Sequence, residues 1–219
     1  MISRSTKFLY YSLLAVPMRI NGAIYRQFRQ NGQPLKAHLG CGQKNYLPGW
    51  VNVDANFLTA KIDLWANLEQ GLPFRDASVE RFYSFHVIEH LPDSALASHF
   101  EEMFRALIPG GVIRVGGPNI DNACLKLMQN DANWFPEFPD KRASVGGRFA
   151  NFVFCRNEHL TALTRSYLKE VAVGAGFTDL HFCVPVIETE YFDKDVLSTE
   201  YEDDLEHPHS ILLEARKPG

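Results

Sequence analysis

The stretch that decides the fold is Leu39-Gly-Cys-Gly42, followed by Gly49-Trp-Val-Asn-Val-Asp54. A strand that ends in Gly-x-Gly lets the backbone approach a ligand without interference from a Cβ atom. A carboxylate at the end of the next strand can accept two hydrogen bonds from vicinal hydroxyls. Because open α/β sheets bind ligands at the carboxyl ends of their strands, we expect Gly40, Gly42 and Asp54 to share one ligand site.

The chain around this stretch reads as an α/β domain, because short apolar runs alternate with helical stretches from Lys36 onward. Eight residues separate Gly42 from Val51, whereas a parallel crossover normally needs about a dozen or more, so the first crossover helix should shrink to a loop or single turn. Apolar periodicity predicts helices over 94–107 and 165–174. We expect strands near 36–39, 51–54, 61–65, 79–85, 112–116, 177–184 and 210–216.

Composition limits the class of protein. The chain has 219 residues, of which 46% are hydrophobic and 22% charged, which indicates one packed domain rather than a disordered or coiled-coil chain. Its four cysteines include no C-x-x-C pair, so we expect a reducing compartment and a cytoplasmic protein. A formal net charge of −4 does not suggest nucleic-acid binding.

The N-terminal segment is basic, because residues 1–53 contain seven of the 22 lysines and arginines and none of the 26 acidic residues. Its apolar run, Phe8–Met18, is too short to span a bilayer, which takes about 20 residues. No small-x-small cleavage site follows Val16, so we do not expect a signal peptide. We expect two short helices around Pro17 that cover part of the domain, and residues 1–30 are a candidate contact for a second copy or for the inner face of a membrane.

Further motifs follow the glycines in a fixed order. They are Leu72-Pro-Phe74, Phe85-His-Val-Ile-Glu-His-Leu91 and Glu102-Met-Phe-Arg-Ala-Leu-Ile-Pro-Gly-Gly-Val-Ile113. With the first stretch they resemble the class I S-adenosylmethionine-dependent methyltransferases, in particular a small bacterial methyltransferase type 11-like subgroup. The resemblance covers residues 36–119 closely and extends more loosely to Phe177.

The resemblance implies a Rossmann-like sheet of seven mostly parallel strands that ends in an antiparallel hairpin. It divides the chain into a basic helical extension, residues 1–34, and an S-adenosylmethionine-binding domain, residues 35–219. The shortened first crossover could leave one sheet face open, and we expect the N-terminal helices to fill it.

The same resemblance implies roles for individual residues. Gly40, Cys41 and Gly42 would face the methionine end of the cofactor, and Asp54 would hold its ribose hydroxyls. Asn67 and Leu68 would recognise adenine, although Asn67 could be an ordinary loop amide. Phe85 and His86 would flank the methionine and sulfonium. One departure from the family is His38, which stands where many members carry an acid that meets the cofactor's amino group.

Two histidines are candidate general bases for a hydroxyl acceptor, since histidine titrates near neutral pH. His86 follows the fourth strand, and His159 precedes the last helix. Glu89 and His90 are expected to orient the loop. His207 and His209 could suggest a metal site, but two histidines in an exposed acidic loop usually bind nothing, and we expect no metal.

The acceptor should contact the irregular aromatic stretch between Gly116 and Arg156, where Lys141, Arg142 and Arg148 could bind an anionic group. These aromatics could instead complete the core. The acidic run 188–206 is expected to be a solvated linker.

We therefore predict methyl transfer from S-adenosylmethionine to a small-molecule or saccharide acceptor, most simply at a hydroxyl. A non-catalytic cofactor-binding or scaffold protein is the main alternative. A nicotinamide-dependent dehydrogenase is disfavoured, because Gln43-Lys-Asn45 lacks the third glycine of a G-x-G-x-x-G fingerprint.

Overall fold

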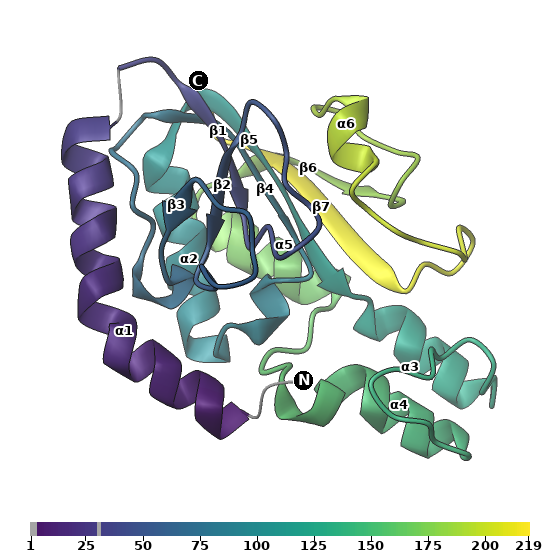
Figure 1. Ribbon diagram of the computed structural model, residues 1–219. Coiled ribbons are helices and arrows are strands. Elements are labelled where there is room, and N and C mark those ends of the chain that lie inside the picture. Colours follow the sequence, from purple (N-terminus) through teal and green to yellow (C-terminus); the bar gives the residue numbers. More distant parts are fainter. Residues whose placement is uncertain (1–3, 30–31) are drawn as a thin grey trace.

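A seven-stranded sheet forms the centre of the molecule (Figure 1). The computed structural model describes residues 4–29 and 32–219, and the side chains of 4–8 and 29 are excluded. Residues 1–3 and 30–31 of the predicted N-terminal extension thus lie outside the described residues. The strands are β1 (Leu35–Leu39), β2 (Val51–Asp54), β3 (Leu64–Trp65), β4 (Val79–Phe85), β5 (Leu107–Pro118), β6 (Thr178–Cys183) and β7 (Ser210–Arg216).

The strand order is β3-β2-β1-β4-β5-β7-β6. All pairings among β1 to β5 are parallel, while β7 runs antiparallel to both β5 and β6. The predicted Rossmann-like sheet with an antiparallel C-terminal hairpin is therefore confirmed. Only β3 is clearly shorter than the strand expected over 61–65, and β5 begins earlier than expected.

Helices cover one face of this sheet. The α-helices are α1 (Arg4–Ile24), α2 (Asp93–Ala106), α3 (Ile120–Met128), α4 (Val145–Phe154), α5 (Arg165–Gly174) and α6 (Lys194–Leu197). A π-helical turn η1 (Tyr25–Arg29) and 3-10 turns η2 (Leu68–Gln70), η3 (Ile88–His90) and η4 (Cys155–Asn157) complete the elements. Leu96 and Phe100 of α2 and Leu168 of α5 pack in one core with Phe82 and Ile113 of the sheet. Both helices lie where the apolar periodicity predicts them.

The opposite face is covered without a crossover helix. Residues 40–50 contain turns and no helix, which confirms the shortened first crossover. Leu47 and Trp50 from this loop pack on Tyr83 of β4 together with Phe192 and Val196, which come from the acidic run before β7. The expectation that 188–206 is a solvated linker is therefore wrong, since this segment supplies buried side chains. The expectation that N-terminal helices fill this face is wrong as well.

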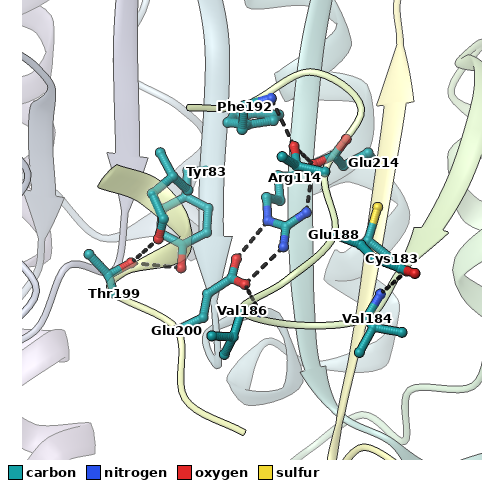
Figure 2. A network of polar contacts seen from close by, with 12 residues as sticks. Tyr83, Arg114, Cys183, Val184, Val186, Glu188, Phe192, Thr199, Glu200 and Glu214 are labelled. Carbon is teal, nitrogen blue, oxygen red and sulfur yellow. Dashed lines mark hydrogen bonds and ion pairs between the residues drawn. The ribbon is translucent and has the colours of Figure 1, made fainter. Parts of the chain in front are cut away.

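A buried ion network holds the acidic segment in place (Figure 2). Arg114 of β5 donates to Glu200 at 2.6 and 2.8 Å and to Glu214 of β7 at 2.5 Å, and all three side chains are fully buried. Burial by itself would lower the pKa of Arg114, but the two carboxylates outweigh it and raise the pKa, so the guanidinium stays charged. Glu214 also accepts the backbone N–H of Glu190, and Glu200 accepts that of Val186. The network thus joins the sheet to the segment that covers it.

The N-terminal helix α1 lies along the β3 edge of the sheet (Figure 1). The Tyr10 hydroxyl donates to the Ala55 carbonyl at 2.8 Å, and the Asn21 amide donates to the Trp65 carbonyl at 2.8 Å. The helix is continuous through Pro17, so the prediction of two short helices is wrong. A proline has no N–H to donate to the helix carbonyl four residues before it. Pro17 is exposed, so water can hydrogen-bond that carbonyl instead. Among the described residues, none of the helices is both long and apolar enough to cross a membrane.

The Arg114 network predicts a large stability effect. Arg114→Met should lower the free energy of unfolding by about 3–5 kcal/mol, because it leaves two buried carboxylates without a cation. Urea denaturation followed by tryptophan fluorescence measures this change. Arg81→Met is the matched control, since Arg81 pairs with Glu80 and Asp193 at the surface and should cost less than about 1 kcal/mol. Equal stability of the two variants would contradict the assignment.

Candidate functional site

A glycine bend follows β1 at the carboxyl edge of the sheet. The backbone N–H groups of Gly40 and Cys41 donate to the Val53 carbonyl of β2 at 2.8 and 3.3 Å. The N–H of Gly42 donates to Asp54 Oδ2 at 2.9 Å. The predicted juxtaposition of the bend and the carboxylate at the end of β2 is therefore present. Since the Cys41 N–H is already paired, a ligand contact from this residue would come from its carbonyl.

Gly40 and Gly42 share a backbone conformation but differ in the space around them. Both have left-handed backbone conformations, with φ of 70° at Gly40 and 58° at Gly42, which glycine adopts without strain. A Cβ on Gly40 would lie 2.3 Å from a methyl group of Val87, the residue that follows His86. A Cβ on Gly42 would meet no heavy atom within 4 Å. The backbone at Gly42 is thus the part of the bend that is open to a ligand.

Asp54 has the chemistry of a diol acceptor. Its Oδ1 accepts the Asn56 N–H at 2.8 Å and its Oδ2 accepts the Gly42 N–H. Each carboxylate oxygen can accept about two hydrogen bonds, so each has room for one more from a hydroxyl. The side chain is half-buried and held in one orientation. These features fit the ribose of an adenosyl cofactor.

The predicted adenine residues lie near the same edge, because the Ala66 N–H donates to the Asp54 carbonyl at 3.2 Å. Asn67 caps the η2 turn, where its side-chain oxygen accepts the Glu69 N–H at 3.0 Å. Leu68 packs its side chain against the main core. Asn67 therefore has a local structural contact, and its role toward adenine stays a prediction.

Helix α1 adds two tyrosines that the sequence analysis did not assign to the site. Tyr10 stacks on Phe57, which follows Asp54 by three residues. Burial raises the pKa of Tyr11, and the nearby charge of Asp54 raises it further. A helical periodicity around residues 10–21 could have shown which face is buried, but not which strand it meets.

At the end of β4, Phe85 is buried and His86 turns toward a cavity. His86 has a left-handed φ of 56°, which is uncommon for a residue with a side chain and typical of functional sites. Its Nε2 lies 2.9 Å from the Ser210 hydroxyl, and its Nδ1 lies 3.3 Å from Glu89 Oε1. Tyr201 stacks on the ring with centroids 5.4 Å apart. The imidazole is thus fixed from three sides.

His159 borders the same cavity as His86. Its Nδ1 lies 3.1 Å from the Val153 carbonyl, and since a carbonyl only accepts, Nδ1 carries the proton. Burial lowers the pKa of His159, so the ring is neutral near pH 7. Both predicted catalytic histidines therefore face one cavity.

The carboxyl group of Glu89 is surrounded by histidines. Burial by itself would raise the pKa of Glu89, but His86 and His90 outweigh burial and lower it. The carboxylate is therefore ionised near neutral pH.

The cavity has a volume of about 1210 Å³. Aromatic rings of Trp134, Phe152 and Tyr201 line it, and its charged lining is mostly acidic: Glu202, Asp203, Asp204 and Glu206, with His209 beside Glu202. Lys141, Arg142 and Arg148 do not line it, because they pair with Glu137 and Asp140 at the surface. The expectation that these bases meet an anionic group on the acceptor is therefore not supported.

Two further histidines have structural contacts. His38 is buried against Tyr83 and Asn52, and burial lowers its pKa to about 4, so it is neutral. His209 Nδ1 lies 2.8 Å from Glu202, and its Nε2 lies 2.5 Å from the Trp134 carbonyl. Burial would lower the pKa of His209, but these partners raise it. Both nitrogens of His209 are therefore donors.

The chain matches known proteins in two ways. Residues 52–115 match a family model described as a methyltransferase domain. A stretch of 48 residues is 52% identical to a probable S-adenosylmethionine-dependent methyltransferase of Mycolicibacterium smegmatis. That stretch is 22% of this chain and 18% of the relative, so the relative extends well beyond the match.

Solved structures share the fold at low identity. An S-adenosylmethionine-dependent methyltransferase from Archaeoglobus fulgidus is 15% identical with a TM-score of 0.52, over 96% of this chain and 99% of that one. A phosphoethanolamine N-methyltransferase from Haemonchus contortus, in complex with S-adenosyl-L-methionine, is 15% identical with a TM-score of 0.53, over 92% of this chain and 53% of that one. The chain thus contains a segment that matches a methyltransferase domain and shares the fold of these structures. The names of the relative and of both structures describe methyltransferases, and the relative and the Archaeoglobus structure are described as S-adenosylmethionine-dependent.

The geometry at Asp54 generates a binding prediction. Asp54→Ala should weaken S-adenosylhomocysteine binding by at least about 1–3 kcal/mol, the value of hydrogen bonds to a charged group, which is roughly a 5- to 150-fold rise in Kd. Isothermal titration calorimetry measures the change. Asp195→Ala on the exposed side of α6 is the control and should leave Kd unchanged. An unchanged Kd for Asp54→Ala would remove this carboxylate from the cofactor site.

Proposed function

We propose that this chain transfers the methyl group of S-adenosylmethionine to a hydroxyl of a saccharide or another small polyhydroxyl acceptor. The observation that carries the proposal is the aromatic and acidic cavity that His86 and His159 line. His86 follows β4, which pairs with β1, the strand that leads into the Gly40–Gly42 bend. A cavity of about 1210 Å³ has room for an acceptor of several rings.

The lining of the cavity favours a sugar over an anionic acceptor. Trp134 and Tyr201 offer flat apolar faces that can stack on the apolar face of a sugar ring, and Asp203 and Glu206 offer carboxylates that accept hydrogen bonds from hydroxyls. A phosphorylated or carboxylated group would instead meet four acidic side chains. An amine would also suit these carboxylates, and a panel of acceptors separates the two.

The protein has to align the acceptor hydroxyl with the methyl group and to remove the proton of that hydroxyl. The cofactor supplies a methyl group on a sulfonium that is already activated for displacement. The cavity walls would orient the acceptor hydroxyl and exclude water, and orientation can remove on the order of 7–11 kcal/mol of the barrier. His86 would take the hydroxyl proton at Nε2, in the place where Ser210 now hydrogen-bonds. The Glu89 carboxylate beside Nδ1 would stabilise the imidazolium that forms.

Turnover with a panel of acceptors tests this function. The purified chain is incubated with S-adenosylmethionine and neutral glycosides, nucleotide sugars or amines, and S-adenosylhomocysteine is quantified by mass spectrometry. Product with glycosides alone supports the proposal, and product with amines alone contradicts the hydroxyl assignment. Cofactor binding without turnover on the panel or on cell extract supports the non-catalytic alternative.

We further propose that the outer face of α1 rests on an anionic membrane surface on the cytoplasmic side. Five exposed apolar residues follow one stripe of this helix: Leu9, Leu13, Val16, Ile20 and Ile24. Residues 1–53 carry no acid and seven bases, which complements anionic headgroups. An amphipathic helix with this pattern lies in the interface plane rather than across the bilayer. All four cysteines are free thiols, which fits a reducing compartment.

His86 should be needed for turnover more than for cofactor binding. His86→Ala should lower kcat by about 10²- to 10⁴-fold, the usual contribution of a general base, while the Kd for S-adenosylhomocysteine changes much less. Steady-state kinetics with the acceptor found above, together with calorimetry, measure both. His181→Ala, on exposed β6, is the control. Full activity of His86→Ala would exclude it as the base.

The α1 stripe predicts vesicle binding. Replacing Leu13, Val16 and Ile20 by serine should weaken binding to phosphatidylglycerol-containing vesicles at least tenfold, since burying each such side chain contributes about 1.5–3 kcal/mol. Sedimentation with vesicles measures the effect. The control replaces Leu125 and Met128, which are exposed on α3, by serine. If the native chain does not bind vesicles but forms a dimer, and the triple variant is a monomer, the stripe is a self-association surface and the membrane proposal is wrong.

A further inference from the structure

Glu89 is the starting point, because its carboxylate is buried and poorly satisfied. Its side chain is 1% exposed, and neither oxygen has a hydrogen-bond partner anywhere in residues 4–29 and 32–219. An unpaired buried carboxylate is costly. The nearest ring nitrogens are His86 Nδ1 at 3.3 Å and His90 Nε2 at 3.8 Å from Oε1, and neither is aligned as a hydrogen bond. The contact with His86 therefore compensates this buried charge only in part, and Oε2 has no hydrogen-bond partner among the described residues.

Two histidines near this carboxylate each donate their Nδ1 proton to a backbone carbonyl. His90 Nδ1 lies 2.9 Å from the Glu158 carbonyl, and His159 Nδ1 lies 3.1 Å from the Val153 carbonyl. Carbonyls only accept, so each Nδ1 carries a proton, and in the neutral form of each ring the lone pair is on Nε2. Histidines that bind metal ions almost always donate their other N–H in this way. One ligand atom from each of Glu89, His90 and His159 lies within 4.8 Å of the others.

The fold holds these three side chains together although His159 is distant in sequence. The N–H groups of Leu160 and Thr161 both donate to the Glu89 carbonyl, at 2.8 and 3.1 Å, which joins the loop of His159 to η3. The room for the carboxylate depends on Gly117, where a Cβ would lie 2.8 Å from Glu89 Oε2. Three consecutive residues before Glu158, numbers 155–157, have left-handed backbones, which is uncommon for residues with side chains. The backbone therefore holds Glu89, His90 and His159 close together.

A second cluster of similar composition shows what a satisfied arrangement looks like. Glu202, Asp203 and His209 also place ligand atoms within 4.8 Å of one another. There, however, both nitrogens of His209 have acceptors, and Glu202 accepts the Ser210 N–H at 3.0 Å. No lone pair of His209 is left for a cation. The difference between the clusters lies in hydrogen bonding rather than in residue type.

We propose that Glu89, His90 and His159 bind a divalent transition-metal ion. Two neutral imidazoles and one carboxylate form the ligand set of many zinc and iron(II) sites that keep positions open for a small molecule. A cation would neutralise the buried carboxylate and use both free Nε2 lone pairs. This assignment departs from the expectation, based on sequence, that the chain has no metal site.

The ion would sit at the wall of the acceptor cavity, because His159 lines that cavity. An open position could hold an acceptor oxygen and lower its pKa. His159 would then be a ligand, and His86 alone would accept the proton. This use of the ion rests on the proposed methyl transfer, whereas binding of the ion does not.

Metal binding to the tag-free, chelator-treated full chain tests the site without cofactor or acceptor. Titration with Co²⁺, followed by its visible absorption, and calorimetry with Zn²⁺ should both give one ion per chain. Glu89→Gln and His159→Ala should each weaken binding at least about 100-fold, beyond the roughly 10- to 100-fold typical of changes to residues that only orient ligands. His209→Ala, in the satisfied cluster, should leave the affinity unchanged.

The outcomes separate the metal site from the proposed activity. Circular dichroism and thermal melting show whether each variant is folded, and His90→Ala, whose side chain is exposed, provides a variant that should not disturb the core. If the native chain binds no ion, or if Glu89→Gln, His90→Ala and His159→Ala all bind as it does, the metal site is refuted. One ion per chain without methyl transfer would refute the activity and leave the site standing.

Discussion

The covering of the second sheet face depends on the compensation of the buried positive charge of Arg114. This β5 residue is fully buried, and two carboxylates compensate its charge, one on the neighbouring strand β7 and one on the loop that crosses the open sheet face. Those carboxylates also accept backbone N–H groups from residues 186–191. Removing either the guanidinium or the carboxylates would leave the opposite charge uncompensated in the interior. These ion pairs therefore hold the segment between β6 and β7 on the sheet, although that segment contains no long helix.

This covering segment also shapes the functional side of the molecule. After Glu200 the chain continues directly into Tyr201 and Glu202, which line the cavity, and then into Ser210, which contacts His86. The ion network on one sheet face therefore fixes the start of a loop whose far end contacts a candidate catalytic residue. The same loop supplies the acidic residues that line the cavity. The buried ion network and the cavity wall thus share a segment that composition alone would describe as solvated.

Particular residues show how far the sequence could lead. The Gly40–Gly42 bend and Asp54 were predictable, because backbone conformation and the ends of parallel strands depend on short-range chemistry. The strands at 51–54, 79–85 and 210–216 and the helix at 165–174 were also found at their predicted bounds. The buried role of Phe192 and Val196 was missed, because a run rich in acids gives no periodic apolar signal. The continuous α1 was missed because a proline inside a helix usually kinks or breaks it, whereas α1 continues through Pro17.

The sequence by itself determined the succession of strands and helices along the chain, the α/β class and the residues that meet at the ends of β1 and β2, since these follow from local periodicity, turn chemistry and strand direction. Only the tertiary structure decided where α1 packs, what covers the second face of the sheet, and that His159 lies beside Glu89 and His90. Those outcomes depend on burial and on which polar groups find partners, and these are properties of segments brought together from distant parts of the chain.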